Sequence, residues 1–106
     1  TLITGVVVAR KDFVEQNPGL VDTFLSQYEQ SVAYTQEDVE GAAKLIGEYD
    51  IVPEAVAQKA LPACNITFIA GDEMQAKLSA YLQTLLEQNP QSIGGELPDD
   101  GFYYLG

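Results

Sequence analysis

Residues 2–9, Leu2-Ile3-Thr4-Gly5-Val6-Val7-Val8-Ala9, decide the fold class that the sequence predicts. Apolar and β-branched residues occupy both faces of this segment, a pattern typical of a strand that is covered on both sides in an α/β protein. A second extended segment is expected from Asn65 to Ala70. We therefore predict an α/β fold in which helices pack on a small sheet.

The first predicted helix begins where Asn17 is followed by Pro18. An Asn side chain accepts hydrogen bonds from the unpaired N–H groups of a first helical turn, and Pro suits the first helical position. We expect this helix to run to about Tyr34. Its apolar residues share one stripe at helical spacing, which indicates a core-facing side. The stripe consists of Leu20, Val21, Phe24, Leu25, Tyr28 and Val32.

Three more amphipathic stretches follow. Thr35 and Asp38 resemble a capping box, which would start the second helix. Small alanines on the inner side of that helix would let it pack closely against a neighbour. The three helices are expected over residues 35–46, over 53–61 with Pro62 as the stop, and over 72–88.

Composition limits the functions open to the chain. It has 106 residues, room for one domain, with 16 acidic and 5 basic residues and a formal net charge of −11. Nucleic acids and anionic lipids bind basic surfaces, so neither is an expected partner. The longest uninterrupted apolar run, Val6 to Ala9, is far too short to cross a bilayer.

The side chains present supply little catalytic chemistry. The chain has no His and one cysteine, Cys64, which excludes His-based triads, an internal disulfide and a multi-Cys zinc site. Cys64 is expected to fill a small apolar space. The Asp99-Asp100-Gly101 motif lacks the alternating ligands of a calcium loop, so a turn is the better interpretation. We expect a protein that is not an enzyme and holds neither a cofactor nor a metal.

The start of the chain also bears on its organisation. Thr1 is followed almost at once by the predicted strand, without an initiating Met or a basic-then-apolar leader. We expect a piece processed or excised from a longer protein. The alternative is a domain separated at its own boundary.

Six motifs occur in order along the chain. They are Thr4 to Phe13, Asn17-Pro18, Val21 with Phe24-Leu25, Ile51 to Pro53, Ala60 to Ile66, and Gly94 to Tyr104. In this order and spacing they resemble the second half of extracytoplasmic solute-binding proteins of ABC-type importers. The nearest branch is related to binders of nitrate, alkanesulfonates, taurine and thiamine-pyrimidine precursors, and the tail resembles proteins of anaerobic Gram-positive bacteria.

The resemblance implies a fold like that of type II periplasmic binding proteins, in which two lobes hold a solute between them. Residues 1–106 would form a single-domain fragment, the C-terminal portion that mainly completes the first lobe. Thr4 and Gly5, on the strand that crosses between lobes, and Asn65 lie where such proteins approach their ligand. The alternative role for each is ordinary hydrogen bonding at a strand end.

The function implied is capture of a small solute by lobe closure and its delivery to the ABC permease. Binding energy would shift an open–closed equilibrium, and the importer would recognise the closed form. The expected location is extracytoplasmic, on the cell surface, with the parent protein anchored as a lipoprotein.

The rival prediction is a free-standing acidic helical module that binds another protein. The predicted strand over residues 2–9 separates the two, because an apolar strand needs sheet neighbours. With few strands available, the unpaired edge is expected to recruit a second copy of the chain, giving a possible homodimer.

Overall fold

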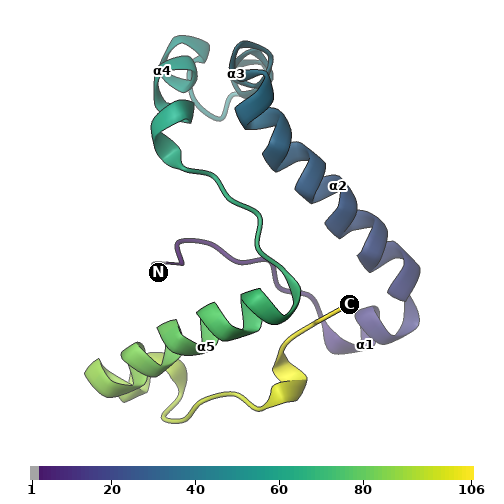
Figure 1. Ribbon diagram of the computed structural model, residues 1–106, viewed down its shortest axis with the longest axis vertical. Coiled ribbons are helices and arrows are strands. Elements are labelled where there is room, and N and C mark those ends of the chain that lie inside the picture. The colour runs from purple at the N-terminus through teal and green to yellow at the C-terminus, as the bar shows by residue number, and fades with distance from the viewer. Residues whose placement is uncertain (1–2) are drawn as a thin grey trace. The chain divides into compact units, whose positions relative to one another are not determined.

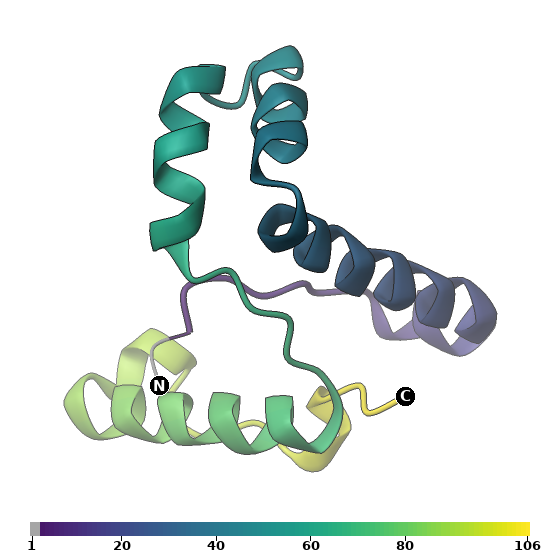
Figure 2. The same cartoon turned by 45° about the horizontal axis from the view of Figure 1, so that its top comes forward.

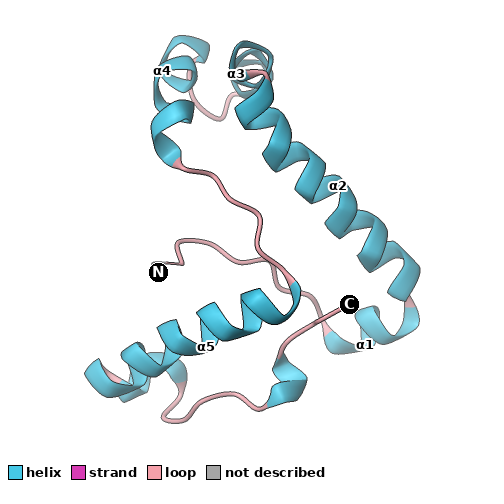
Figure 3. Cartoon of the chain, viewed as in Figure 1, coloured by secondary structure: helices cyan, strands magenta, loops and turns pink. Residues whose placement is uncertain are grey.

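The computed structural model describes residues 3–106, and all the regular secondary structure of these residues is helical (Figures 1 and 3). The elements are α1 (Lys11–Gln16), α2 (Pro18–Glu37), α3 (Val39–Glu48), α4 (Glu54–Cys64), α5 (Gly71–Gln88) and the 3₁₀ turns η1 (Pro90–Ile93) and η2 (Asp100–Phe102). Four of the α-helices correspond to the four predicted amphipathic stretches. α1 is a single short helix whose first turn contains Asp12.

The α/β prediction is wrong, because residues 3–106 contain no strand and no sheet. Thr1 and Leu2 lie outside the described residues. Residues 3–10 and 65–70 are irregular, and Val8 is 80% exposed. A β-branched run favours extended backbone, but a strand exists only when a neighbour supplies its ladder of hydrogen bonds. Neither predicted segment has such a neighbour in the described chain.

Two helix boundaries differ from their predictions. The capping box with Thr35 is wrong, because α2 continues to Glu37 and the side chain of Asp38 caps α3 by accepting from the Gly41 N–H at 2.9 Å. Pro62 does not stop α4, which continues to Cys64. A proline so near a helix end removes one backbone hydrogen bond at an exposed position, where water replaces the lost donor.

The chain divides into two compact units. The first contains α5, η1, η2 and the N-terminal segment as far as Phe13. The second, Val14–Phe68, contains α2, α3 and α4. Each unit has its own internal contacts.

The core of the second unit lies where α3 and α4 run alongside each other in opposite directions (Figure 2). Its buried side chains are Ala42 and Ala43 of α3 and Ala57 of α4, each at most 4% exposed. Gly47 lies against the start of α4, since a Cβ at this position would be 3.0 Å from the Cβ of Glu54. The predicted close packing through small residues is therefore present, but it buries little apolar area.

The first unit is built on α5 and the turns that follow it. The chain reverses after η1 through Gly94 and Gly95, whose φ angles of 81° and 93° favour glycine. The Gln75 side-chain amide donates to the carboxylate of Asp100 at 3.3 Å, which connects η2 to α5. The apolar stripe of α5 is half-buried in this unit. It consists of Met74, Leu78, Tyr81, Leu82, Leu85 and Leu86.

Candidate functional site

An open notch in the second unit lies between the C-terminal half of α2 and one side of α3. Its volume is about 610 Å³. The notch exists because the single residue Asp38, with φ −136° and ψ 77°, separates the two helices and turns the chain sharply. The lining residues are Gln27, Gln30, Ser31, Tyr34 and Thr35 of α2 with Ala42, Leu45 and Ile46 of α3.

The two walls of the notch differ in chemistry. The α2 wall presents amide and hydroxyl groups, while the α3 wall is apolar and carries Leu45, which is 44% exposed. No charged side chain lines the notch. The Thr35 hydroxyl already donates to the Val32 carbonyl at 2.6 Å, within α2. Such a surface offers hydrogen bonds and apolar contact to a bound group, but no paired nucleophile and base.

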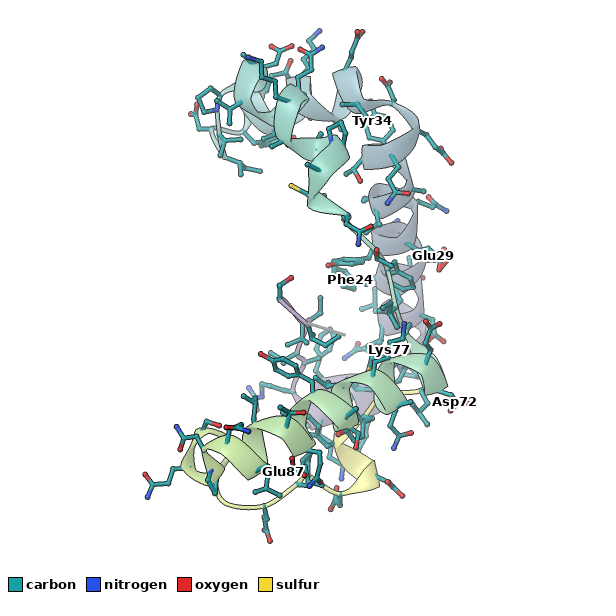
Figure 4. All side chains as sticks on the ribbon, turned by 60° about the vertical axis from the view of Figure 1, so that its left-hand side comes forward. Phe24, Glu29, Tyr34, Asp72, Lys77 and Glu87 are labelled. Atoms are coloured by element: carbon teal, nitrogen blue, oxygen red, sulfur yellow. The ribbon has the colours of Figure 1, made fainter. Side chains whose placement is uncertain are left out.

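Tyr34, Asp38 and Gly41 form a hydrogen-bonded cluster where the two helices meet. The Tyr34 hydroxyl donates to one carboxylate oxygen of Asp38 at 3.3 Å, and the other oxygen accepts from the Gly41 N–H. Gly41 leaves room for both groups, because a Cβ there would overlap the Tyr34 hydroxyl and the Asp38 carboxylate. Partial desolvation, the negative charge of Asp38 and the hydrogen bond to it raise the pKa of Tyr34 above its ordinary value. Figure 4 labels Tyr34 near this corner.

Three aromatic rings form a second feature of the same unit. Phe24 and Tyr28 have ring centroids 5.9 Å apart, and Tyr28 and Phe68 have centroids 5.7 Å apart. Phe24, labelled in Figure 4, is 49% exposed and Tyr28 is 41% exposed. The side-chain amide of Gln36 donates to the backbone carbonyl of Ile66, which holds the segment after α4 against α2. The predicted core stripe of α2 is thus only partly covered.

The three residues predicted to approach a ligand lie in different parts of the chain. Thr4 and Gly5 are exposed in the irregular N-terminal segment of the first unit. Asn65 belongs to the second unit, where it ends α4 in the left-handed conformation with φ 52° and ψ 46°. Asn tolerates this conformation better than most residues, which gives Asn65 a local structural role.

The structure also tests the predictions made for Cys64 and Asn17. Cys64 is exposed, so its predicted burial is wrong. The Asn17 side chain makes no capping hydrogen bond to α2, although its carbonyl accepts from the Val21 N–H at 3.1 Å. Among residues 3–106, no three His, Cys, Asp or Glu side chains lie together so that they could hold a metal ion, and no helix has the length and hydropathy needed to cross a membrane.

Sequence reasoning missed the notch. Its polar wall is visible in the sequence as Gln27, Ser31 and Tyr34, which lie at i, i+4 and i+7 beside the apolar stripe of α2. This spacing puts the three residues on one side of a helix, but it does not show that α3 lies beside them. That arrangement depends on the backbone of Asp38.

No protein family, curated protein or solved structure matches the chain.

Proposed function

We propose that this chain is the C-terminal portion of the solute-binding component of an ABC-type importer. In this role it helps to form a protein that captures a small solute outside the cytoplasm and delivers it to the permease. The chain contributes helices and surface to that protein and catalyses no reaction. Lobe closure on the solute, with recognition of the closed form, remains the proposed mechanism.

The ordered motifs support this proposal. Residues 4–13, the Asn17-Pro18 helix start and residues 94–104 are spread over almost the whole chain, as in the second half of such binding proteins. The described residues would supply helices to such a binding protein, since they form no sheet of their own. The resemblance to the importer component therefore rests on the order of the motifs.

The exposed apolar surface is the structural observation that carries the proposal. Three alanines are the buried hydrophobic residues of the described chain, while Val6, Val7, Leu20 and Phe24 are each about half exposed or more. Soluble proteins rarely leave so many large apolar side chains in water unless another surface covers them. In a solute-binding component, the rest of the same polypeptide provides that cover.

The test uses the protein in the cells that produce it. An antibody raised against residues 90–106 is applied to fractionated cells, with and without protease treatment of intact cells. We expect a polypeptide much larger than the 106-residue chain, in the membrane fraction and accessible to external protease. Thermal-shift measurements on that polypeptide with sulfonates, nitrate and pyrimidines then identify the solute. A band of the chain's own size, protected inside the cells, refutes the proposal.

A free-standing acidic interaction module is the second candidate. The antiparallel pair α3 and α4 favours it, because Ala42, Ala43 and Ala57 form a core without a sheet. Light scattering and urea unfolding of the isolated chain distinguish the candidates. A stable monomer that unfolds cooperatively favours the module, whereas association or a broad, non-cooperative transition favours the incomplete protein.

A further inference from the structure

We propose that the notch between α2 and α3 binds a basic amphipathic helix of a partner protein. The partner's apolar side chains would contact Leu45 and Ile46, and its polar groups would face Gln27 and Ser31. The proposal goes beyond solute capture, because it assigns the second unit a binding surface of its own.

The two unlike walls favour an amphipathic occupant. Leu45 and Ile46 offer apolar contact on the α3 side, while the amides of Gln27 and Gln30 and the Ser31 hydroxyl offer hydrogen bonds on the α2 side. Recognition of an amphipathic helix in a groove requires apolar anchors on one side and polar contacts on the other.

The acidic charge of the second unit favours a partner helix that is positively charged. The second unit, Val14–Phe68, carries nine acidic residues and two lysines, a formal charge of −7. Asp38 lies where the two helices meet and is bonded to the lining residue Tyr34 at 3.3 Å. Glu37 and Glu40 are close to Asp38 in sequence and are exposed. Cationic side chains that flank the apolar anchors of a partner would meet this negative field.

A second copy of the chain is a poor occupant for the same reason. Each copy has a formal charge of −11, so two acidic surfaces would face each other across the notch. Like charges placed opposite each other suppress association. The helix that fits the notch is therefore basic and comes from another protein.

The test compares fluorescent helical peptides with the purified chain. One peptide has leucines on one face and lysines on the other, and the second has the same leucines with glutamates. Fluorescence anisotropy at low salt measures both dissociation constants. We expect saturable binding of the basic peptide only, weakened as salt screens the charges.

Matched variants locate the binding surface. Leu45→Ser removes an apolar anchor of the notch, while Val56→Ser changes a similarly exposed residue of α4, 53% exposed against 44% for Leu45, outside the lining. We expect Leu45→Ser to raise the dissociation constant about tenfold, or about 1.4 kcal/mol, and Val56→Ser to leave it nearly unchanged. Circular dichroism of both variants tests whether they keep their helices.

Three results would overturn the proposal. They are no saturable binding of the basic peptide to the helical chain, equal binding of the acidic peptide, and equal effects of the two substitutions. The last result would indicate non-specific attraction to an acidic surface. None of them bears on the cell-fractionation test, so the proposed importer role stands or fails separately.

Discussion

The cap of α3 provides a sharp test of the structure, because sequence and structure assign it to different residues. The side chain of Asp38 accepts from the Gly41 N–H at 2.9 Å, whereas the hydroxyl of Thr35 donates to Val32 within α2. Replacing a capping Asp by Ala costs about 1 kcal/mol, within a range of roughly 0.5–2. We therefore expect Asp38→Ala to lower the free energy of unfolding by about 1 kcal/mol.

Two further variants separate the contributions of charge and of hydrogen bonding to this loss of unfolding free energy. Asp38→Asn keeps a capping oxygen but loses the favourable charge at the helix N-terminus and the carboxylate oxygen that accepts from the exposed Tyr34 hydroxyl, so we expect a loss of about 0.3–1 kcal/mol. Thr35→Ala leaves the cap intact and removes one hydrogen bond within α2, so we expect a loss of about 0.5 kcal/mol or less.

Urea denaturation followed by circular dichroism measures all three variants, with the slope m compared to detect any change in the unfolded state. The expected order of destabilisation is Asp38→Ala, then Asp38→Asn, then Thr35→Ala. If Thr35→Ala costs more than Asp38→Ala, the capping box inferred from the sequence is correct and the α2–α3 corner is wrongly described.

Three other predictions concern the core, the tyrosine and the exposed surface. Ala43→Leu should destabilise the chain by about 1–3 kcal/mol in urea, since Ala43 is fully buried between helices, and the exposed control Ala80→Leu should change stability by less than about 0.5 kcal/mol. The pKa of Tyr34 is raised in the folded state, so its stabilising effect is complete below about pH 10 and is lost as the pH rises further. Tyr34→Phe should therefore reduce the loss of unfolding free energy at alkaline pH. Equal losses in both proteins would contradict the Tyr34–Asp38 interaction. Light scattering should show the chain associating as salt is raised from roughly 0.02 to 0.5 M, because screening weakens repulsion between copies of charge −11 while the apolar surface stays exposed; a mass independent of salt would count against self-association.

The positions of the helices follow from local sequence. The Asn17-Pro18 start predicted α2, the apolar spacing from Met74 to Leu86 predicted α5, and both were confirmed. These signals are local because a helix satisfies its backbone hydrogen bonds within a few residues. The ends of the helices were predicted less accurately than their positions. Pro62 did not end α4, since a proline in the last turns removes only one hydrogen bond.

The predicted site shows the limit of the same reasoning. Asn65 was singled out through a resemblance, and its described role is a left-handed helix end, which a single sequence does not distinguish from ligand contact. The notch was missed although Gln27, Ser31 and Tyr34 share one side of α2. A helical face becomes a wall only when another element lies beside it.

The sequence by itself determined the helical segments, the acidic charge and the absence of histidine chemistry, because each depends on residue identity and short spacing. Only the tertiary structure decided that residues 3–9 and 65–70 form no strand, that Asp38 rather than Thr35 caps α3, and that α2 and α3 enclose a notch. The physical reason is the range of the interactions. A helix is stabilised by neighbours along the chain, whereas a strand or a binding groove is made by groups that the chain must bring together in space.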